Sequence, residues 1–600
     1  MRLGRFRLGL AGFVALGVLV AASPALAEPK AVLEGVDDED LRGRIERAVG
    51  VTENPPETRF QARRRAQEAA EDAIAALRSE GYYAYTVEPD ITDDEPPQAV
   101  LRINTGPRFT IANPSVNYTG AAPGAEAIEA VRAALDLDPG EPGRAAEVIA
   151  AEGRAVAALS ARGYADARAA ERQVVVDHAD QTLRPAYNID AGGLVRMDGI
   201  RVTTDGRTNP RWVERLAPWR EGEVYDPEDV AELERRLLDT GVYDSVTVAL
   251  APREQTTPDG HRPVVVSLSD RPKSTLEAGA SYSTSEGAGL DLIWNRYNRL
   301  GRADTLTLEA HLAEIQQRAV ARISLPHWRR PAQTLIAGVE VLRDFTDAFD
   351  REALILRADL RYRFAKTSFY SYGLMADYGR SAELFLDPNT LMPEKLKRDL
   401  TILSAPISLS LDYSDDPLDP KRGWRVSSEV QPAYSMGDES LWFIRAQAQG
   451  SIYLPLDSGG RTVVAGRLRI GSIWNGRVPE VPPAYRFYAG GGGSVRGFEY
   501  QGIGPRVPTT EVPRGGVSLV ETSIELRREL FGNWGAAVFL DAGSVGTDPA
   551  PDFSIVQSAI GAGVRYKLPF GPIRADVAFP LDREAGQASF QVYVSLGQAF

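Results

Sequence analysis

The 600-residue sequence contains no cysteine and only four histidines. The lack of cysteine excludes disulfide staples and thiolate chemistry. The few, widely spaced histidines argue against a histidine-based metal site or catalytic triad, and we predict neither a metal nor a cofactor. Positive charge is also scarce: 68 Lys and Arg minus 82 Asp and Glu gives −14, which argues against a nucleic-acid partner.

Recognisable catalytic motifs are missing as well. No Gly-x-Ser-x-Gly nucleophile motif is present, because Gly493-Ser-Val-Arg496 fails at the final glycine. The glycine run Gly490–Gly493 is not followed by Gly-Lys-Ser/Thr, so it is not a phosphate-binding loop. We therefore predict that the protein is not an enzyme.

Long apolar runs are absent beyond the N-terminus, which argues against an internal transmembrane helix. Residues 1–27 have the features of a secretory signal peptide. They combine early arginines, an apolar core over 8–22 and the small-residue cleavage site Ala25-Leu-Ala27. An uncleaved membrane anchor is the alternative, but the apolar core is short and ends in Ser23-Pro24. We expect the mature chain to begin at Glu28.

Three similar stretches recur between residues 28 and 270. Each has a helical apolar pattern followed by a glycine, a nearby aromatic residue and the start of a strand. The glycines are Gly81, Gly163 and Gly241, and their spacings are 163 − 81 = 82 and 241 − 163 = 78 residues. Such a regular period indicates repeated domains, and glycine suits the left-handed cap at a helix end. We predict three α+β domains with the order β-α-α-β-β: residues 28–106, 107–190 and 191–270. Generic α+β repeats are the plainer alternative.

The pattern changes near Asp270. Segments of about ten residues then alternate apolar and polar side chains, for example over 354–364 and 463–470. Such alternation is typical of a transmembrane β-barrel. A soluble sandwich fits less well, because the polar positions carry many charges that a water-filled lumen accommodates. We count sixteen strands in residues 271–600, and an even number returns both ends of the barrel to the same side of the membrane.

One glycine-rich stretch interrupts this alternation: Phe487-Tyr-Ala-Gly-Gly-Gly-Gly-Ser-Val-Arg-Gly-Phe498. Four consecutive glycines disfavour a strand, yet the stretch is too apolar for a solvated loop. It contains one cation, Arg496, which needs an anionic partner if buried. The stretch resembles the lid-loop motif of the outer-membrane insertases of the BamA/TamA family, which combine POTRA domains with a 16-stranded barrel. The matching residues are Phe487, Gly490, Gly491, Val495, Arg496, Gly497 and Phe498.

In that family the lid loop dips into the barrel, where acidic residues of the wall hold its arginine. Alternation within 517–529 places Glu521, Glu525 and Arg527 toward the lumen, and the same parity places Phe539 and Asp541 inside. The resemblance implies that Glu525 and Asp541 clasp Arg496 while Phe539 packs beside the loop. An arginine fork suits two carboxylates, because its donors are fixed and its charge is permanent.

The C-terminal segment 589–600 resembles the β-signal of outer-membrane proteins. Its matching residues are Phe590, Val592, Val594, Leu596 and Phe600. Strands 275–284 and 589–600 would meet at the barrel seam. Small residues such as Gly279 and Gly597 predict weak cross-strand packing there.

The resemblance implies an outer-membrane assembly and insertion factor with its POTRA domains in the periplasm. It would fold autotransporter-type clients through POTRA docking and the seam. Three repeats favour the TamA branch, which works with a large inner-membrane partner of the TamB kind. The expected partners are that protein, unfolded clients and outer-membrane lipid. A BamA-like general insertase and a two-partner-secretion translocase are alternatives, and a passive outer-membrane channel is the alternative from another class.

Overall fold

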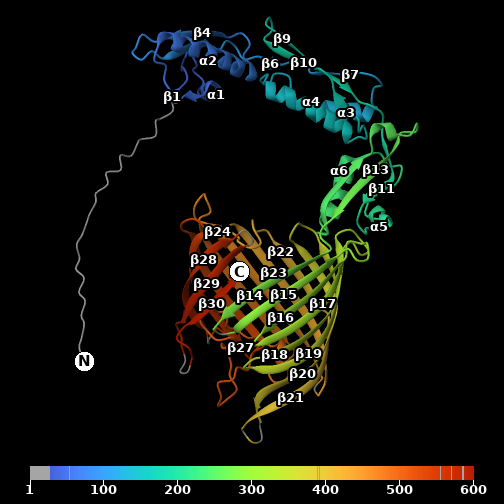
Figure 1. Cartoon of the computed structure of the whole chain (residues 1–600), viewed down its shortest axis with the longest axis vertical. Coiled ribbons are helices and arrows are strands. Elements are labelled where there is room, and N and C mark those ends of the chain that lie inside the picture. Colours follow the sequence, from blue (N-terminus) through green and yellow to red (C-terminus); the bar gives the residue numbers. More distant parts are fainter. Residues whose placement is uncertain are drawn as a thin grey trace, which may run out of the picture. The chain divides into compact units, whose positions relative to one another are not determined.

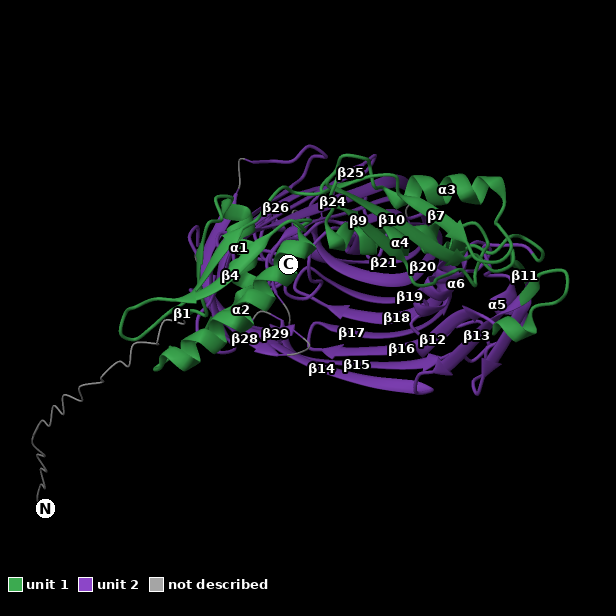
Figure 2. Ribbon diagram, turned by 90° about the horizontal axis from the view of Figure 1, so that it is seen from above, with its two compact units in different colours: residues 1–197, 221–228, 252–262 green, residues 198–220, 229–251, 263–600 purple. Residues whose placement is uncertain are grey.

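The computed structural model describes residues 28–600 except 53, 285, 388–389, 391, 439, 554–555, 569–570, 584–586 and 597. The predicted signal peptide, residues 1–27, therefore lies outside the described part of the chain. Two compact units are present (Figure 2). One contains the chain up to residue 197 with 221–228 and 252–262, and the other contains 198–220, 229–251 and 263–600.

The first α/β module is a three-stranded sheet, in the order β2-β5-β4, with two helices packed on it. Buried residues of β5 and an apolar stripe on each helix form its core, which includes Ile45, Leu77 and Leu101. Thr58 caps the second helix by accepting from Gln61 N. The elements are β1 (Glu28–Pro29), β2 (Val32–Glu34), α1 (Glu39–Val49), β3 (Val51–Thr52), α2 (Arg59–Ser79), β4 (Thr86–Ile91) and β5 (Ala99–Asn104).

The second module has the same layout around a long central strand, β10, which pairs with all the other strands of its sheet. Tyr187 on β10 is fully buried and donates to Val148 O of the overlying helix. The elements are β6 (Thr110–Ile111), β7 (Ser115–Tyr118), α3 (Ala125–Leu135), α4 (Ala145–Ser160), β8 (Arg168–Ala169), β9 (Gln173–Asp177) and β10 (Thr182–Asp190).

The third module places β13 between β11 and β12. All three modules have two helices before their closing strands, of which there are two in the first and third modules and three in the second. Gly81, Gly163 and Gly241 follow the second helix of each module with φ of +92°, +92° and +70°, a conformation that glycine adopts without strain. The elements are β11 (Arg196–Thr204), α5 (Pro210–Glu214), α6 (Pro227–Leu238), β12 (Tyr243–Leu250), a 3₁₀ turn (Arg253–Gln255) and β13 (His261–Asp270).

A buried ion pair links the loop after α4 to β13. Arg262, 3% exposed, donates from Nη1 and Nη2 to the two oxygens of Asp166 at 2.9 and 2.6 Å. Its Nε donates to Thr256 Oγ1 at 2.7 Å. The bidentate hydrogen bond from Arg262 holds the pKa of Asp166 below its ordinary value, against the opposing effect of burial.

We therefore expect acid to weaken the α/β segment through Asp166. A carboxyl with a lowered folded-state pKa stabilises the fold above its unfolded pKa, near 4, and this stabilisation disappears as the pH falls through the folded value. At pH 7, Asp166→Asn should destabilise segment 28–270 by ~1–2 kcal/mol, as expected for a charged hydrogen bond. The difference should disappear as the pH falls through the lowered folded-state pKa of Asp166. Urea unfolding of both proteins across this pH range measures it, and an equal difference at every pH would contradict it. Asp138→Asn, at an exposed carboxylate of the second module, serves as the control.

Residues 274–596 form a closed barrel (Figure 1). Seventeen strand segments are present, but β21 and β22 both lie between β20 and β23 and together form one strand, interrupted at Ala405-Pro406. Proline has no N–H for the ladder. The predicted count of sixteen is therefore confirmed. The first nine segments are β14 (Ser274–Ser283), β15 (Gly287–Tyr297), β16 (Thr305–Ala313), β17 (Gln316–Leu325), β18 (Gln333–Phe345), β19 (Phe349–Arg363), β20 (Phe369–Leu386), β21 (Pro393–Ser404) and β22 (Ile407–Asp412).

The remaining eight segments complete the ring, and β30 returns to β14. They are β23 (Gly423–Gly437), β24 (Leu441–Pro455), β25 (Thr462–Trp474), β26 (Ser518–Glu529), β27 (Trp534–Gly546), β28 (Gln557–Leu568), β29 (Gly571–Pro580) and β30 (Gln591–Leu596). Ile524 and Leu526 on β26 face outward, while Glu521 and Glu525 on the other face are fully buried. This apolar-out, polar-in alternation matches a membrane-spanning barrel. Within the described residues, no helix combines the length and hydropathy needed to cross a bilayer.

The third module is joined to the barrel by contacts at three turns. Asn298 Nδ2 donates to Thr208 Oγ1 at 2.9 Å in the β15–β16 turn. His327, between β17 and β18, donates from Nε2 to Arg236 O at 3.0 Å, and burial lowers the pKa of this ring. Arg363, at the end of β19, pairs with Asp239 at 2.6 Å. These contacts place the third module at the end of the barrel where the β15–β16, β17–β18 and β19–β20 turns lie.

Candidate functional site: the lumen lid and the seam

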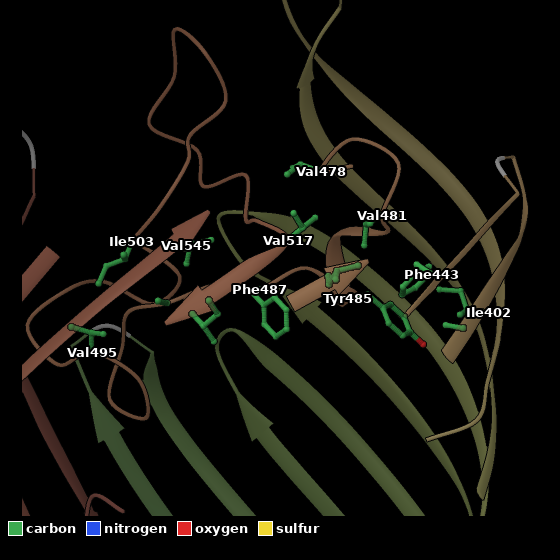
Figure 3. Packing of buried hydrophobic residues seen from close by; sticks show 14 of the residues in the cluster. Ile402, Phe443, Val478, Val481, Tyr485, Phe487, Val495, Ile503, Val517 and Val545 are labelled. Carbon is green, nitrogen blue, oxygen red and sulfur yellow. The ribbon is translucent and has the colours of Figure 1, made fainter. Parts of the chain in front are cut away.

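Residues 475–517, between β25 and β26, form a long loop folded against the inside of the barrel, which we call the lid. We call residues 475–487 its root and 488–503 its tip. The root and the returning limb pair at Phe487 and Gly516, whose N–H groups and carbonyls bond in both directions at 2.8 and 2.9 Å. Buried apolar side chains of the lid pack in one cluster with the wall (Figure 3): Val478, Val481, Tyr485, Phe487, Val495 and Ile503. Phe498 belongs to the same cluster. Each fully buried side chain of this size contributes roughly 1.5–3 kcal/mol.

Arg496, at the tip, is 2% exposed and lies among carboxylates of the wall. Its Nε and Nη2 donate to the two oxygens of Asp541 at 2.7 and 3.0 Å, and its backbone N–H also donates to Asp541 at 3.1 Å. Its Nη1 donates to Glu525 at 2.9 Å. The guanidinium carbon lies 3.3 Å from the centre of the Phe539 ring. Arg496 therefore lies together with Glu525, Phe539 and Asp541, in the arrangement that the resemblance of the lid motif implies.

A third carboxylate, Asp576 on β29, was not assigned a role from the sequence, although its alternation with Arg574 marks it as lumen-facing. Arg496 Nη1 lies 3.3 Å from it. Wall arginines balance the wall carboxylates: Arg527 bonds Glu525 at 2.9 Å, Arg565 bonds Glu525 at 3.3 Å and also contacts Asp576, and Arg574 lies 3.6 Å from Asp576. We call these six wall residues the socket: Glu525, Asp541, Asp576, Arg527, Arg565 and Arg574. Three negative and three positive charges leave the socket formally neutral before Arg496 is added.

The glycines of the tip permit close contact with the wall. Gly490, Gly491 and Gly497 have φ of +108°, +97° and +100°, which side-chain-bearing residues rarely adopt. On the wall, Gly543 leaves room for the lid, because a Cβ there would lie 2.7 Å from Val495 Cγ2. The Phe-x-Asp-x-Gly pattern of β27 therefore supplies a ring, a carboxylate and a space for the same loop.

The tip also contacts the turn after β14 and strand β30, the two sides of the seam. Gly492 N donates to Glu286 Oε1 at 3.0 Å, in the turn after β14. On β30, Tyr593 Oη accepts from Gly497 N at 3.1 Å and donates to Phe498 O at 3.3 Å. Neither Glu286 nor Tyr593 was singled out from the sequence, although the inward parity of Tyr593 on the last strand was a usable signal. A polar cavity of about 430 Å³ lies beside these contacts, and both seam strands line it.

The seam itself is short. Between β14 and β30 the described register contains two pairs, Tyr282 with Val594 and Ser283 with Tyr593. By contrast, β14 and β15 pair over ten positions, from Ser274 to Ser283. Thr284 adds a backbone bond to Val592 O at 3.1 Å. The seam therefore has far less backbone pairing than the next interface in the ring.

The C-terminal prediction needs one correction. The last strand was expected to run over 589–600, but β30 ends at Leu596. Phe590, Val594 and Leu596 are exposed on the outer face and Val592 is half-buried. Phe600 instead packs with Tyr453, Val463 and Ala465, and its ring centre lies 5.3 Å from the Arg527 guanidinium. Phe600 therefore lies inside the barrel, among apolar side chains and beside an arginine, and not on the outer face.

Comparisons with known proteins agree with this architecture. The Omp85 superfamily domain matches residues 298–600, which is 303 of 600 residues. The chain therefore belongs to the Omp85 superfamily of β-barrel proteins.

Individual relatives are more distant. The chain is 26% identical over 430 residues to the outer membrane protein assembly factor BamA of Neorickettsia risticii, covering 66% of this chain and 55% of that protein. It is 22% identical over 583 residues to the factor of the same name from Neisseria meningitidis serogroup B, covering 87% and 71%. The chain thus spans about half the length of the first of these relatives.

A solved structure has a similar fold. The crystal structure of BamA from Haemophilus ducreyi lacking POTRA domains 1–3 matches with a TM-score of 0.67 at 18% identity. The match covers 81% of this chain and all of that one. At this identity the likeness concerns the fold.

Proposed function

We propose that the protein is an outer-membrane assembly and insertion factor that folds β-barrel clients into the lipid through its seam. One observation carries this proposal: a weakly paired seam lies beside a lid that is bonded to both of its sides. An opened seam exposes unpaired strand edges, and such an edge templates a new strand. The relatives named as outer membrane protein assembly factors support the same function.

We propose that the three α/β modules are POTRA domains, with boundaries at 28–106, 107–190 and 191–270, and that they lie in the periplasm. Each has a small sheet with free edges. On β9, at the edge of the second sheet, Val174 and Val175 are 38% and 57% exposed. An edge of this kind accepts an extended segment by backbone pairing, with little demand on side-chain sequence.

No enzymatic step is needed for this function. A client strand forms hydrogen bonds with the opened edge and buries its apolar face in lipid, while unpaired backbone in hydrocarbon is too costly to persist. Three modules favour the TamA branch, with autotransporter-type clients and a TamB-like partner spanning the periplasm. A BamA-like general insertase is the alternative that the named relatives favour.

Reconstitution tests this function. Lipid vesicles containing the protein are mixed with a urea-unfolded outer-membrane barrel, and folding is followed by the gel shift between folded and heat-denatured client. We expect folding to be faster than in empty vesicles, and an equal rate would contradict the proposal. Single-channel recording tests the passive-channel alternative, which requires a steadily open conductance. An autotransporter barrel compared with a porin as client separates the two insertase branches.

A further inference from the structure

A second buried ion cluster, separate from the socket, holds the root of the lid. Arg486 is 4% exposed. Its Nη2 donates to Glu383 Oε1 at 2.9 Å, and its Nη1 contacts the other oxygen of Glu383. Its Nε donates to Val481 O at 2.8 Å and its Nη1 to Arg514 O at 3.0 Å. Arg486 thus connects the root, the returning limb and the barrel wall.

The wall side of this cluster is also well bonded. Glu383, on β20, is 6% exposed and lies 3.2 Å from Arg398 Nη2 on β21. The same Arg398 nitrogen donates to Pro479 O of the root at 2.7 Å. Tyr485, the residue before Arg486, donates from Oη to Asp377 of β20 at 2.9 Å. The contacts that Arg486, Pro479 and Tyr485 of the root make with the wall all reach strands β20 and β21.

The two clusters hold the lid to different parts of the ring. When β21 and β22 are counted as one strand, β20 is the seventh of sixteen and β29, which carries Asp576, is the fifteenth. The difference, 15 − 7 = 8, is half of the ring, while β26 and β27, which carry Glu525 and Asp541, are the twelfth and thirteenth strands, five and six strands from β20. The lid therefore crosses the lumen, and the four glycines from Gly490 to Gly493 lie between its two attachments.

We propose that Arg486 and Glu383 are positioning residues that keep the root fixed while the tip leaves the socket. The lid then works as a hinged flap rather than as a loop that is expelled whole. The difference in attachment supports this division. Arg486 is tied to Glu383 and to two backbone carbonyls, of which the Arg514 carbonyl lies on the returning limb. Arg496 is tied to side chains and lies beyond four consecutive glycines. This inference rests on the proposed function in one respect: it assigns the movement of the tip to client insertion.

Cysteine labelling tests the hinge, because the chain has no cysteine of its own. Val481→Cys reports on the root and Val495→Cys on the tip, since both side chains are fully buried. Arg496→Ala should raise maleimide labelling at position 495 at least tenfold and leave position 481 protected. Arg486→Ala should raise labelling at position 481 by a similar factor. Glu383→Gln is the milder variant if Arg486→Ala does not fold, and the gel shift of the intact barrel reports folding.

Charge exchange provides the rescue. Arg486→Glu combined with Glu383→Arg should restore protection at position 481 relative to Arg486→Glu alone. Equal exposure of positions 481 and 495 in Arg496→Ala would show that the lid moves as one body and would overturn the proposal, as would full protection of position 481 in folded Arg486→Ala. Labelling needs no client, so its outcome is independent of insertase activity. If the hinge is present, Arg486→Ala should also slow client insertion, and wild-type insertion with an exposed root would overturn the positioning role.

Discussion

Replacing Arg496 by alanine is expected to release the tip of the lid while the barrel stays folded. The substitution removes the ion pairs with Asp541 and Glu525, and losing one partner of a fully buried cluster costs ~3–5 kcal/mol, or less where water enters. Glu525 and Asp576 keep their contacts with the three arginines of the socket, whereas Asp541 loses its ion pair with Arg496, so the cost falls mainly on Asp541. We expect chymotrypsin to cut at Phe498 and Tyr500 in the variant and client insertion to fall at least ~tenfold, equivalent to about 1.4 kcal/mol.

The control is Arg322→Ala, which removes a lumen arginine paired with Glu309 on the neighbouring strand. It should leave both cutting and insertion unchanged. Asp541→Asn should have a larger effect than Glu525→Gln, because Asp541 accepts three bonds from Arg496 whereas Glu525 accepts one and is also held by Arg527. A tip that stays protected, together with full activity in Arg496→Ala, would show that this ion cluster does not hold the lid.

Locking the seam should abolish client insertion. Tyr282 and Val594 are direct partners across β14 and β30. Cysteines at both positions should oxidise to a disulfide, because directly opposed residues of antiparallel strands have Cα atoms about 4.5–5.5 Å apart, within disulfide reach. With the edges held together, a client strand has no unpaired backbone to join. We expect the oxidised protein to lose insertion activity and a reductant to restore it.

A second disulfide serves as the matched control. Val594→Cys with Ala575→Cys joins β30 to β29, its partner on the other side, and leaves the seam free. This pair should insert clients at the wild-type rate in either redox state. Wild-type insertion by the fully oxidised Tyr282–Val594 pair would rule out lateral insertion at this seam.

The strand count and the faces of the strands could be predicted from sequence because alternation is a local property. The parity of residues 517–529 is enough to place Glu521 and Glu525 inside. The lid contacts with Glu525 and Asp541 came from the family motif, which carries information that alternation lacks. The same alternation marks Asp576 as lumen-facing. It does not show that β29 lies next to the tip, because that depends on the curvature of the closed ring.

Other features depend on contacts between distant parts of the chain. Arg486 and Glu383 are 103 positions apart, and neither stands in a pattern that points to the other. Phe600 fits an outward-facing terminal strand by its spacing. In the structure, Tyr453, Val463, Ala465 and Arg527 surround it inside the lumen. Whether the Phe600 side chain lies on the lipid-facing surface or in this inner site depends on side chains of distant strands. Its position therefore cannot be deduced from the sequence of the last strand alone.

The third α/β module bears on which side of an opening barrel moves. Its contacts with Asn298, His327 and Arg363 brace the turns that join β15 to β20, which belong to the N-terminal half of the ring. The tip of the lid is bonded mainly to β26, β27 and β29, in the C-terminal half. If clients enter at the seam as proposed, we expect the braced half to stay fixed when β14 and β30 separate, and β26–β30 to swing outward. A client strand that pairs with β14 would then grow from a stationary template, and the moving strands β26–β30 would take up the change in circumference.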